Sequence, residues 1–163
     1  MFYLPVLLED METGTKRLRA AVKALAEVPS VDTSRMAAIG YCFGGAMALH
    51  LARIGTDIKA AVSFHGALDS FHQAVPGEIK ARVLVCHGDA DEFISKESIE
   101  AFHQEMRTAN VDYEFISYPG ALHGFTSPEA DENGEKYGLP LAYDENADKE
   151  SWRAMNRLFT ELF

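Results

Sequence analysis

Cysteine is scarce in this sequence, which contains only Cys42 and Cys86. Two thiols in separate segments provide neither a disulfide framework nor the closely spaced ligand pair of a zinc site. The six histidines show no spacing typical of metal ligands either. We therefore predict no metal site. The low cysteine content suits a reducing compartment, and we expect a cytoplasmic location.

Basic residues and long apolar runs are also lacking. Fifteen lysines and arginines stand against 25 acidic residues, which gives a formal net charge of −10. Nucleic acids and anionic membranes favour basic surfaces, so we expect neither as a partner. No segment approaches the roughly 20 apolar residues of a membrane-spanning helix.

The apolar start of the chain, residues 2–8, lacks the basic residues and the small-residue cleavage site of a signal peptide. Three interpretations stay open: a strand fragment, an arm that covers exposed sheet, or the remnant of a truncated start. Pro5 weakens the first, because proline cannot donate a hydrogen bond to a sheet ladder. We therefore favour an arm or a remnant.

What the sequence does contain is an alternation of short apolar runs and helical segments. Its 163 residues, 47% of them apolar, suffice for one domain that spans residues 1–163. The alternation predicts an α/β fold with a mostly parallel sheet flanked by helices. The expected strands are residues 36–39, 60–64, 82–86 and 113–118, and the expected helices cover about 11–27, 46–52, 95–108 and 148–163.

The last part of the chain is predicted to be a loop and a helix. Residues 120–148 are rich in Pro, Gly, Asp and Glu, and a long irregular segment of this kind often shapes a binding site. The helix that follows has an apolar stripe, which predicts core packing. The stripe comprises Trp152, Met155, Leu158, Phe159 and Phe163.

The most informative motif is Gly40-Tyr41-Cys42-Phe43-Gly44. It lies between an expected strand and an expected helix, which is the nucleophile-elbow pattern with cysteine in place of serine. The turn is so tight that we expect a side chain at either flanking glycine to clash. A helix N-terminus also favours thiolate over thiol. The alternative is that Cys42 is a small buried filler, because free cysteine is often buried.

Two further polar motifs follow expected strands, where open α/β sheets bind their ligands. His87-Gly88-Asp89-Ala90-Asp91 comes after one strand, and His123 lies in Gly120–Phe125 after the next. The order nucleophile, acid, histidine is that of α/β-hydrolases. Either Asp89 or Asp91 could be a turn-capping residue without chemistry. We favour Asp91 as the acid, because it precedes a loop that opens a helix at Ser95.

The other five histidines have less specific interpretations. His50 and His103 lie in helical segments and are expected to pack or to face solvent. His65 and His72 follow the strand at 60–64 and could border a pocket. His87 is expected to brace the turn that carries the acid.

Three ordered motifs together resemble the dienelactone hydrolase family of α/β-hydrolases: Gly40-Tyr41-Cys42-Phe43-Gly44-Gly45, His87-Gly88-Asp89-Ala90-Asp91 and Gly120-Ala121-Leu122-His123-Gly124-Phe125. The tail, with Ala142-Tyr143-Asp144 and Ser151-Trp152, is similar to the family as well. The resemblance runs from about Thr15 to the C-terminus and implies the C-terminal part of the α/β-hydrolase fold.

By this resemblance, the chain would hydrolyse lactones or small carboxylic esters without metal or organic cofactor. Cys42 would be the nucleophile that forms an acyl-thioester, and His123 would be the general base and acid. Asp91 would orient His123, and the Phe43 N–H would help to hold the oxyanion.

The chain departs from the family in two places. Only 41 residues precede Cys42, whereas family members usually carry several strands and a helix there. That portion normally supplies a second oxyanion N–H, a Glu that contacts the cysteine and part of the pocket. At Ser127, dienelactone-cleaving members tend to have an Arg that grips the substrate carboxylate, so we expect a simpler ester. The alternative is an inactive or complementing fragment of a hydrolase that acts as a non-enzymatic subunit.

The short N-terminal portion has a second consequence, for the sheet. A complete member of this fold would carry more strands beside the first strand expected here, and an exposed strand edge pairs readily with other chains. We therefore predict that this edge is covered, either by a second chain, as in a homo-oligomer, or by the N-terminal arm.

Overall fold

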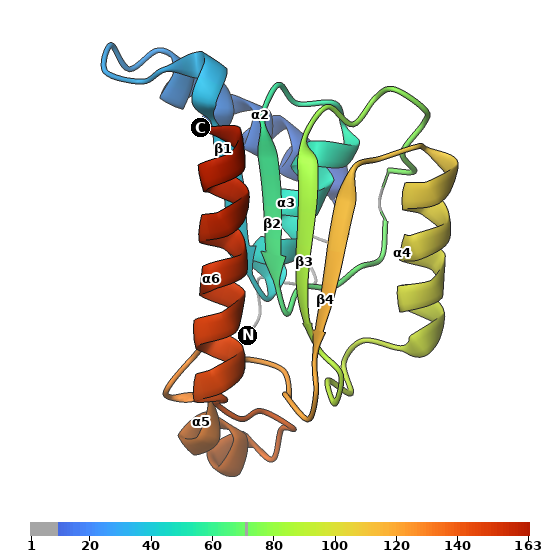
Figure 1. The fold of residues 1–163 in the computed structure, drawn as a ribbon, viewed down its shortest axis with the longest axis vertical. Helices are drawn as coiled ribbons and strands as arrows, with labels where there is room; N and C mark the ends of the chain where they lie inside the picture. Colours follow the sequence, from blue (N-terminus) through green and yellow to red (C-terminus); the bar gives the residue numbers. More distant parts are fainter. Residues whose placement is uncertain (1–9, 71) are drawn as a thin grey trace.

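A computed structural model describes residues 10–70 and 72–163 of the chain. In this part, four strands form one all-parallel sheet in the order β1-β2-β3-β4 (Figure 1). The strands are β1 (Ala37–Tyr41), β2 (Ala60–Phe64), β3 (Arg82–Gly88) and β4 (Tyr113–Tyr118). The predicted α/β class and the four predicted strands are confirmed. The predicted N-terminal arm lies outside the described residues.

Helices cover both faces of the sheet. α3 (Phe43–Arg53) and α4 (Lys96–Thr108) pack on one face, and α2 (Met11–Ala26) lies against α3. α6 (Glu145–Leu162) covers the opposite face, as Figure 1 shows. The connections contain the short helices η1 (Thr33–Arg35) and α5 (Ala130–Tyr137). Within the described residues, no helix combines the length and the apolar character needed to cross a bilayer.

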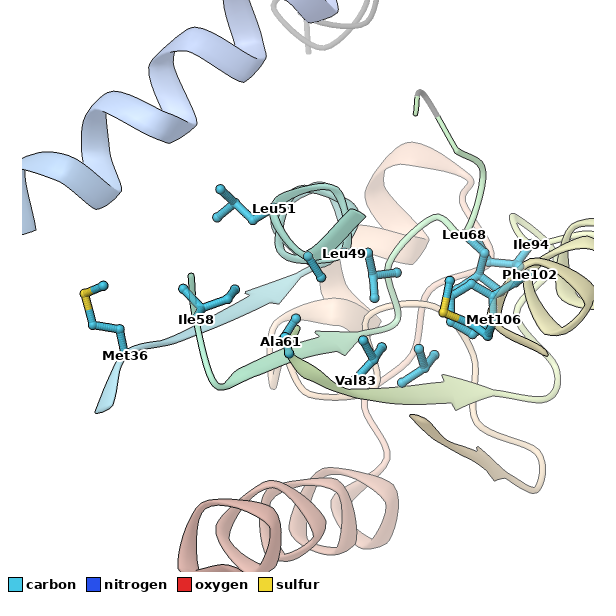
Figure 2. Close-up of a cluster of buried hydrophobic side chains, with 13 residues drawn as sticks. Met36, Leu49, Leu51, Ile58, Ala61, Leu68, Val83, Ile94, Phe102 and Met106 are labelled. Carbon is cyan, nitrogen blue, oxygen red and sulfur yellow. The ribbon is translucent and has the colours of Figure 1, made fainter. Parts of the chain in front are cut away.

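The core follows from the side-chain alternation of the two central strands. In β2, Ala61 belongs to the cluster under α3 and α4, whereas Val62 packs under α6. Both faces of β2 and β3 are buried, which explains why their sequences are continuous apolar runs. Figure 2 shows the first cluster, on the side of the sheet away from α6, with Leu49 from α3 and Phe102 and Met106 from α4.

The segment before the last helix is more regular than predicted. α6 begins at Glu145 rather than at residue 148, because the Asp144 carboxylate accepts the Ala147 N–H at 2.9 Å and caps the helix. The expected loop also contains α5, which is followed by Gly138 in the left-handed conformation typical of residues that cap a helix C-terminus.

The apolar stripe of α6 is only partly as predicted. Met155 and Leu158 are buried, but Trp152 is 49% exposed, so the prediction that it belongs to the core is wrong. The buried face of the helix continues instead through small residues, which let the helix approach the sheet closely. These are Ala147, Ser151 and Ala154.

β1 is a terminal strand, with no strand on its outer side among residues 10–70 and 72–163. The Met36 carbonyl and the Cys42 N–H both bond toward β2. By alternation, Ala37, Ile39 and Tyr41 direct their backbone groups away from β2. Ile39 and Tyr41 are also 45% and 40% exposed as residues. Such an edge is a template for strand pairing.

We expect this edge to be covered in solution, by a second chain or by the N-terminal segment. Amide hydrogen exchange at Ile39 and Tyr41, combined with light scattering of the purified protein, tests the expectation. A paired edge protects both amides, because their hydrogens are then bonded, and a second copy also doubles the mass. Fast exchange of both amides in a non-aggregating monomer would contradict the prediction.

Candidate active site

Cys42 occupies the turn between β1 and α3 and is the N-terminal cap residue of α3. Its φ of 52° and ψ of −120° lie in a region that residues other than glycine rarely adopt. The Cys42 residue is exposed. The geometry is therefore that of a strained strand-to-helix turn presenting a thiol, and the interpretation of Cys42 as a buried filler is wrong.

Two glycines allow neighbouring atoms to approach the backbone of this turn closely. A Cβ on Gly40 would lie 2.0 Å from the Gly44 carbonyl oxygen, and a Cβ on Gly45 would lie 2.5 Å from Ser63 Oγ. Both distances are far inside normal contact. A Cβ on Gly44 would meet nothing within 4 Å, so the expectation of a clash at both flanking positions is wrong for Gly44.

His123 lies in the loop after β4, and its ring connects the other two candidate residues. Its Nε2 atom lies 3.2 Å from Cys42 Sγ, and its Nδ1 atom lies 2.8 Å from Asp91 Oδ2. The three residues come from three separate strand ends, as predicted from the sequence. The structure brings all three into one hydrogen-bonded chain.

The two candidate acids have separate partners. The Asp91 side chain is fully buried, and its Oδ1 atom accepts the Phe93 N–H at 2.9 Å while Oδ2 faces His123. Asp89 is exposed and accepts the Gly120 N–H, which ties together the loops after β3 and β4. Asp91, the residue that the sequence favours, is therefore the carboxylate in contact with the imidazole.

These contacts shift the protonation of both the thiol and the imidazole. The hydrogen bond to His123 lowers the pKa of the Cys42 thiol and outweighs burial, which acts in the opposite direction; the Phe43 N–H also favours the thiolate. For His123, burial disfavours the charged ring, but the hydrogen bonds to Asp91 and Cys42 raise its pKa to about 9. These contacts therefore shift the equilibrium toward the thiolate of Cys42 and the imidazolium of His123.

Two aromatic rings bracket His123. Phe93 is 49% exposed and His65 is buried, and the centroid of each ring lies 5.0 Å from that of His123, close to edge-to-face. The sequence suggests His65 only as a residue that could border a pocket. No sequence pattern singles out Phe93, although its position two residues after the acid is a usable signal in retrospect.

The remaining histidines have other contacts: His50 with Thr15, His72 with Glu78, His87 with Phe115 and His103 with Tyr113. His87 lies within β3 rather than in the turn that it is expected to brace. Across residues 10–70 and 72–163, no group of three or more His, Cys, Asp or Glu side chains is arranged to hold a metal ion.

Comparison with known proteins gives a consistent match. The chain matches the family described as "Dienelactone hydrolase family" over residues 5–163. The crystal structure of a dienelactone hydrolase-like promiscuous phosphotriesterase from metagenomic libraries is 40% identical, with a TM-score of 0.86, and the match covers 98% of this chain and 66% of that one.

Two relatives differ in how much of their length is matched. An uncharacterized protein of Caenorhabditis elegans is 42% identical over 153 residues, which cover 90% of this chain and 92% of that protein. A Yersinia pestis protein named "Putative carboxymethylenebutenolidase" is 32% identical over 138 residues, which cover 80% of this chain and 48% of that protein. The chain thus spans about half the length of the Yersinia relative.

The lowered pKa of Cys42 predicts how its alkylation by iodoacetamide depends on pH. Thiolate is the reactive form, so the midpoint of the rate profile should fall below the value of about 8.5 for an ordinary thiol. His123→Ala should move the midpoint upward, because it removes the hydrogen bond that stabilises the thiolate. Cys86→Ser is the matched control and should leave the profile unchanged, because Cys86 is buried. A midpoint at or above the ordinary value would contradict the prediction.

Proposed function

Because the chain belongs to the dienelactone hydrolase family, we propose that it hydrolyses lactones or small carboxylic esters through a Cys42–His123–Asp91 triad. One observation carries the proposal: Cys42 Sγ and Asp91 Oδ2 lie 3.2 Å and 2.8 Å from the two ring nitrogens of a single imidazole. A nucleophile in reach of a base that is itself oriented by a third group is the arrangement of nucleophilic catalysis.

In the first step, the Cys42 thiolate attacks the ester carbonyl carbon. A C–S bond forms and the carbonyl electron pair moves to oxygen, where the Phe43 N–H helps to hold the negative charge. His123 then gives its proton to the leaving alkoxide as the C–O bond breaks. The products of this step are an alcohol, an acyl-thioester on Cys42 and a neutral imidazole.

In the second step, neutral His123 takes a proton from water, and the hydroxide adds to the thioester carbonyl. Collapse of the adduct breaks the C–S bond, releases the carboxylic acid and restores the thiolate and imidazolium. Asp91 fixes the ring throughout, because its carboxylate accepts the Nδ1 hydrogen and leaves Nε2 facing Cys42. With a lactone, the alcohol stays tethered and the product is one hydroxy acid.

The surroundings of the site favour a neutral, activated ester. By the resemblance, dienelactone-cleaving members hold an Arg at the position of Ser127; here Ser127 donates a hydrogen bond to the Glu129 carboxylate, so this position supplies no cation for a substrate carboxylate. Phe93 presents an exposed apolar ring beside His123. A thiolate is also a good leaving group, so the tetrahedral adduct of an amide would expel the thiolate rather than the amine. This favours activated esters over amides as substrates. The name of the Yersinia relative supports a lactone as the substrate class.

Substitution of the proposed nucleophile and base tests the function directly. Cys42→Ser and His123→Ala should each lower kcat/KM for p-nitrophenyl acetate by at least about 10²-fold, because each removes a member of the proton-transfer chain. The measurement is initial-rate hydrolysis by folded protein, with His103→Phe as a control outside the site. Unchanged turnover in both site variants would rule out the assignment.

The two aspartates after β3 provide a matched pair of variants. Asp91→Asn should lower kcat by about 10²- to 10⁴-fold, because an amide does not hold and charge-stabilise the imidazole as a carboxylate does. Asp89→Asn keeps an acceptor for the Gly120 N–H and should leave kcat close to that of the unaltered protein. Equal effects of the two substitutions would show that the carboxylate acts through the turn and not through His123.

A further inference from the structure

A buried histidine lies directly beneath the loop that carries His123. His65 is the first residue after β2, is 4% exposed, and its backbone N–H bonds to the Cys86 carbonyl at 2.8 Å. Its ring centroid lies 5.0 Å from that of His123 and 5.1 Å from that of Phe125, in both cases close to edge-to-face. His65 therefore contacts two residues of the loop that presents the imidazole.

A hydrogen bond also connects the His65 side chain to the same loop. His65 Nε2 lies 2.8 Å from Thr126 Oγ1, three residues beyond His123. Gly124, between them, has a φ of 76°, a left-handed conformation that favours glycine, and its carbonyl accepts the Ser127 N–H at 2.8 Å, which closes a tight turn that contains Thr126. The bond thus joins His65, the residue after β2, to the turn that directly follows His123.

The turn that contains His65 also touches the cysteine. The Cys42 N–H donates to the Phe64 carbonyl at 3.0 Å. A Cβ on Gly66 would lie 2.9 Å from the Cys42 carbonyl oxygen, so the two backbones are in close contact. Residues 64–66 therefore meet Cys42 on one side and the His123 loop on the other.

The backbone of His65 is strained. Its φ of 40° is unusual for a residue with a Cβ and would suit glycine or asparagine better. A buried imidazole held at such a position, with its Nε2 bonded to the His123 loop, points to a role for the side chain. His65 is also well suited to lie beside a charged ring, because burial, followed by the charge of His123, lowers its pKa to about 4.

We propose that His65 is a positioning residue, which acts with Thr126 to hold the His123 loop at the distance where Nε2 meets the Cys42 thiol. The proposal deepens the proposed function, because hydrolysis depends on that contact. It concerns the geometry of the thiol–imidazole pair, so the pair itself can be observed without turnover.

Three substitutions distinguish the effect of the His65–Thr126 hydrogen bond from the effect of side-chain packing. Thr126→Val keeps the volume but removes the hydroxyl, His65→Phe keeps a ring but removes its nitrogens, and His65→Gln keeps a polar group near the Nε2 position. The matched control is His103→Phe, which removes a 3.0 Å contact with Tyr113 away from the site. Circular dichroism and thermal melting establish that each variant is folded.

Two readouts are measured, the pH profile of Cys42 alkylation by iodoacetamide and the kinetics with p-nitrophenyl acetate. We expect Thr126→Val and His65→Phe to move the alkylation midpoint upward and to lower kcat by about 10- to 100-fold with little change in KM, because a displaced ring no longer meets the thiol. The His65→Gln variant should keep a kcat and an alkylation midpoint close to those of the unaltered protein, because it retains a polar group near the Nε2 position. His103→Phe should change neither quantity.

A folded Thr126→Val variant with the alkylation profile and kcat of the unaltered protein would overturn the proposal, and this holds even where His65→Phe fails to fold. A lower kcat without a shifted alkylation profile would also overturn it, because the residue would then act on the substrate. Loss of the proposed function is distinguishable: unchanged hydrolysis by Cys42→Ser refutes the esterase assignment, whereas the alkylation profile still decides the role of His65.

Discussion

A hydrogen-bonded chain of three side chains has to close across nearly the whole width of the sheet. Cys42 follows β1, Asp91 follows β3 and His123 follows β4, so the strand order places β2 and β3 between the cysteine and the strand that leads to the histidine. In the proposed hydrolysis, these contacts of 3.2 Å and 2.8 Å tolerate little displacement, since a shift of about 1 Å in a catalytic group can cost roughly 10²-fold in rate. The loop after β4 therefore has to cross the ends of the two intervening strands, and the residues beneath it, His65 and Asp91, both contact it.

The same small region makes two imidazoles behave in opposite ways. The rings of His65 and His123 lie 5.0 Å apart. Burial disfavours charge on both, yet the pKa of His123 is raised to about 9 and that of His65 is lowered to about 4. The difference is the partner, because His123 bonds to the Asp91 carboxylate, whereas His65 bonds to the Thr126 hydroxyl. Protonation is thus confined to the ring that meets the thiol, and its neighbour stays neutral.

The parts of this arrangement that are local in sequence could be predicted, and the parts that depend on tertiary contacts could not. The turn at Cys42 has a signature because a tight strand-to-helix connection needs glycine at Gly40, and the buried strands are visible as apolar runs. Residue type alone does not separate Asp89 from Asp91, since both carboxylates contact the loop after β4 and only Asp91 meets the His123 ring. Trp152 has the spacing of a core residue but is 49% exposed. The buried face of α6 consists partly of small residues, which the apolar pattern does not reveal. His65 looks ordinary until the fold places it under His123.

The contrast between the two cysteines has a practical consequence. Cys86 lies in β3 with no exposed surface, and burial raises the pKa of its thiol to about 12, whereas Cys42 is exposed with a pKa shifted downward. Thiol reagents should therefore label the native protein at Cys42 alone, without substitution of Cys86. A maleimide dye, a spin label or an activity-based probe reports on one defined position, and labelling of a second equivalent measures the fraction of unfolded molecules.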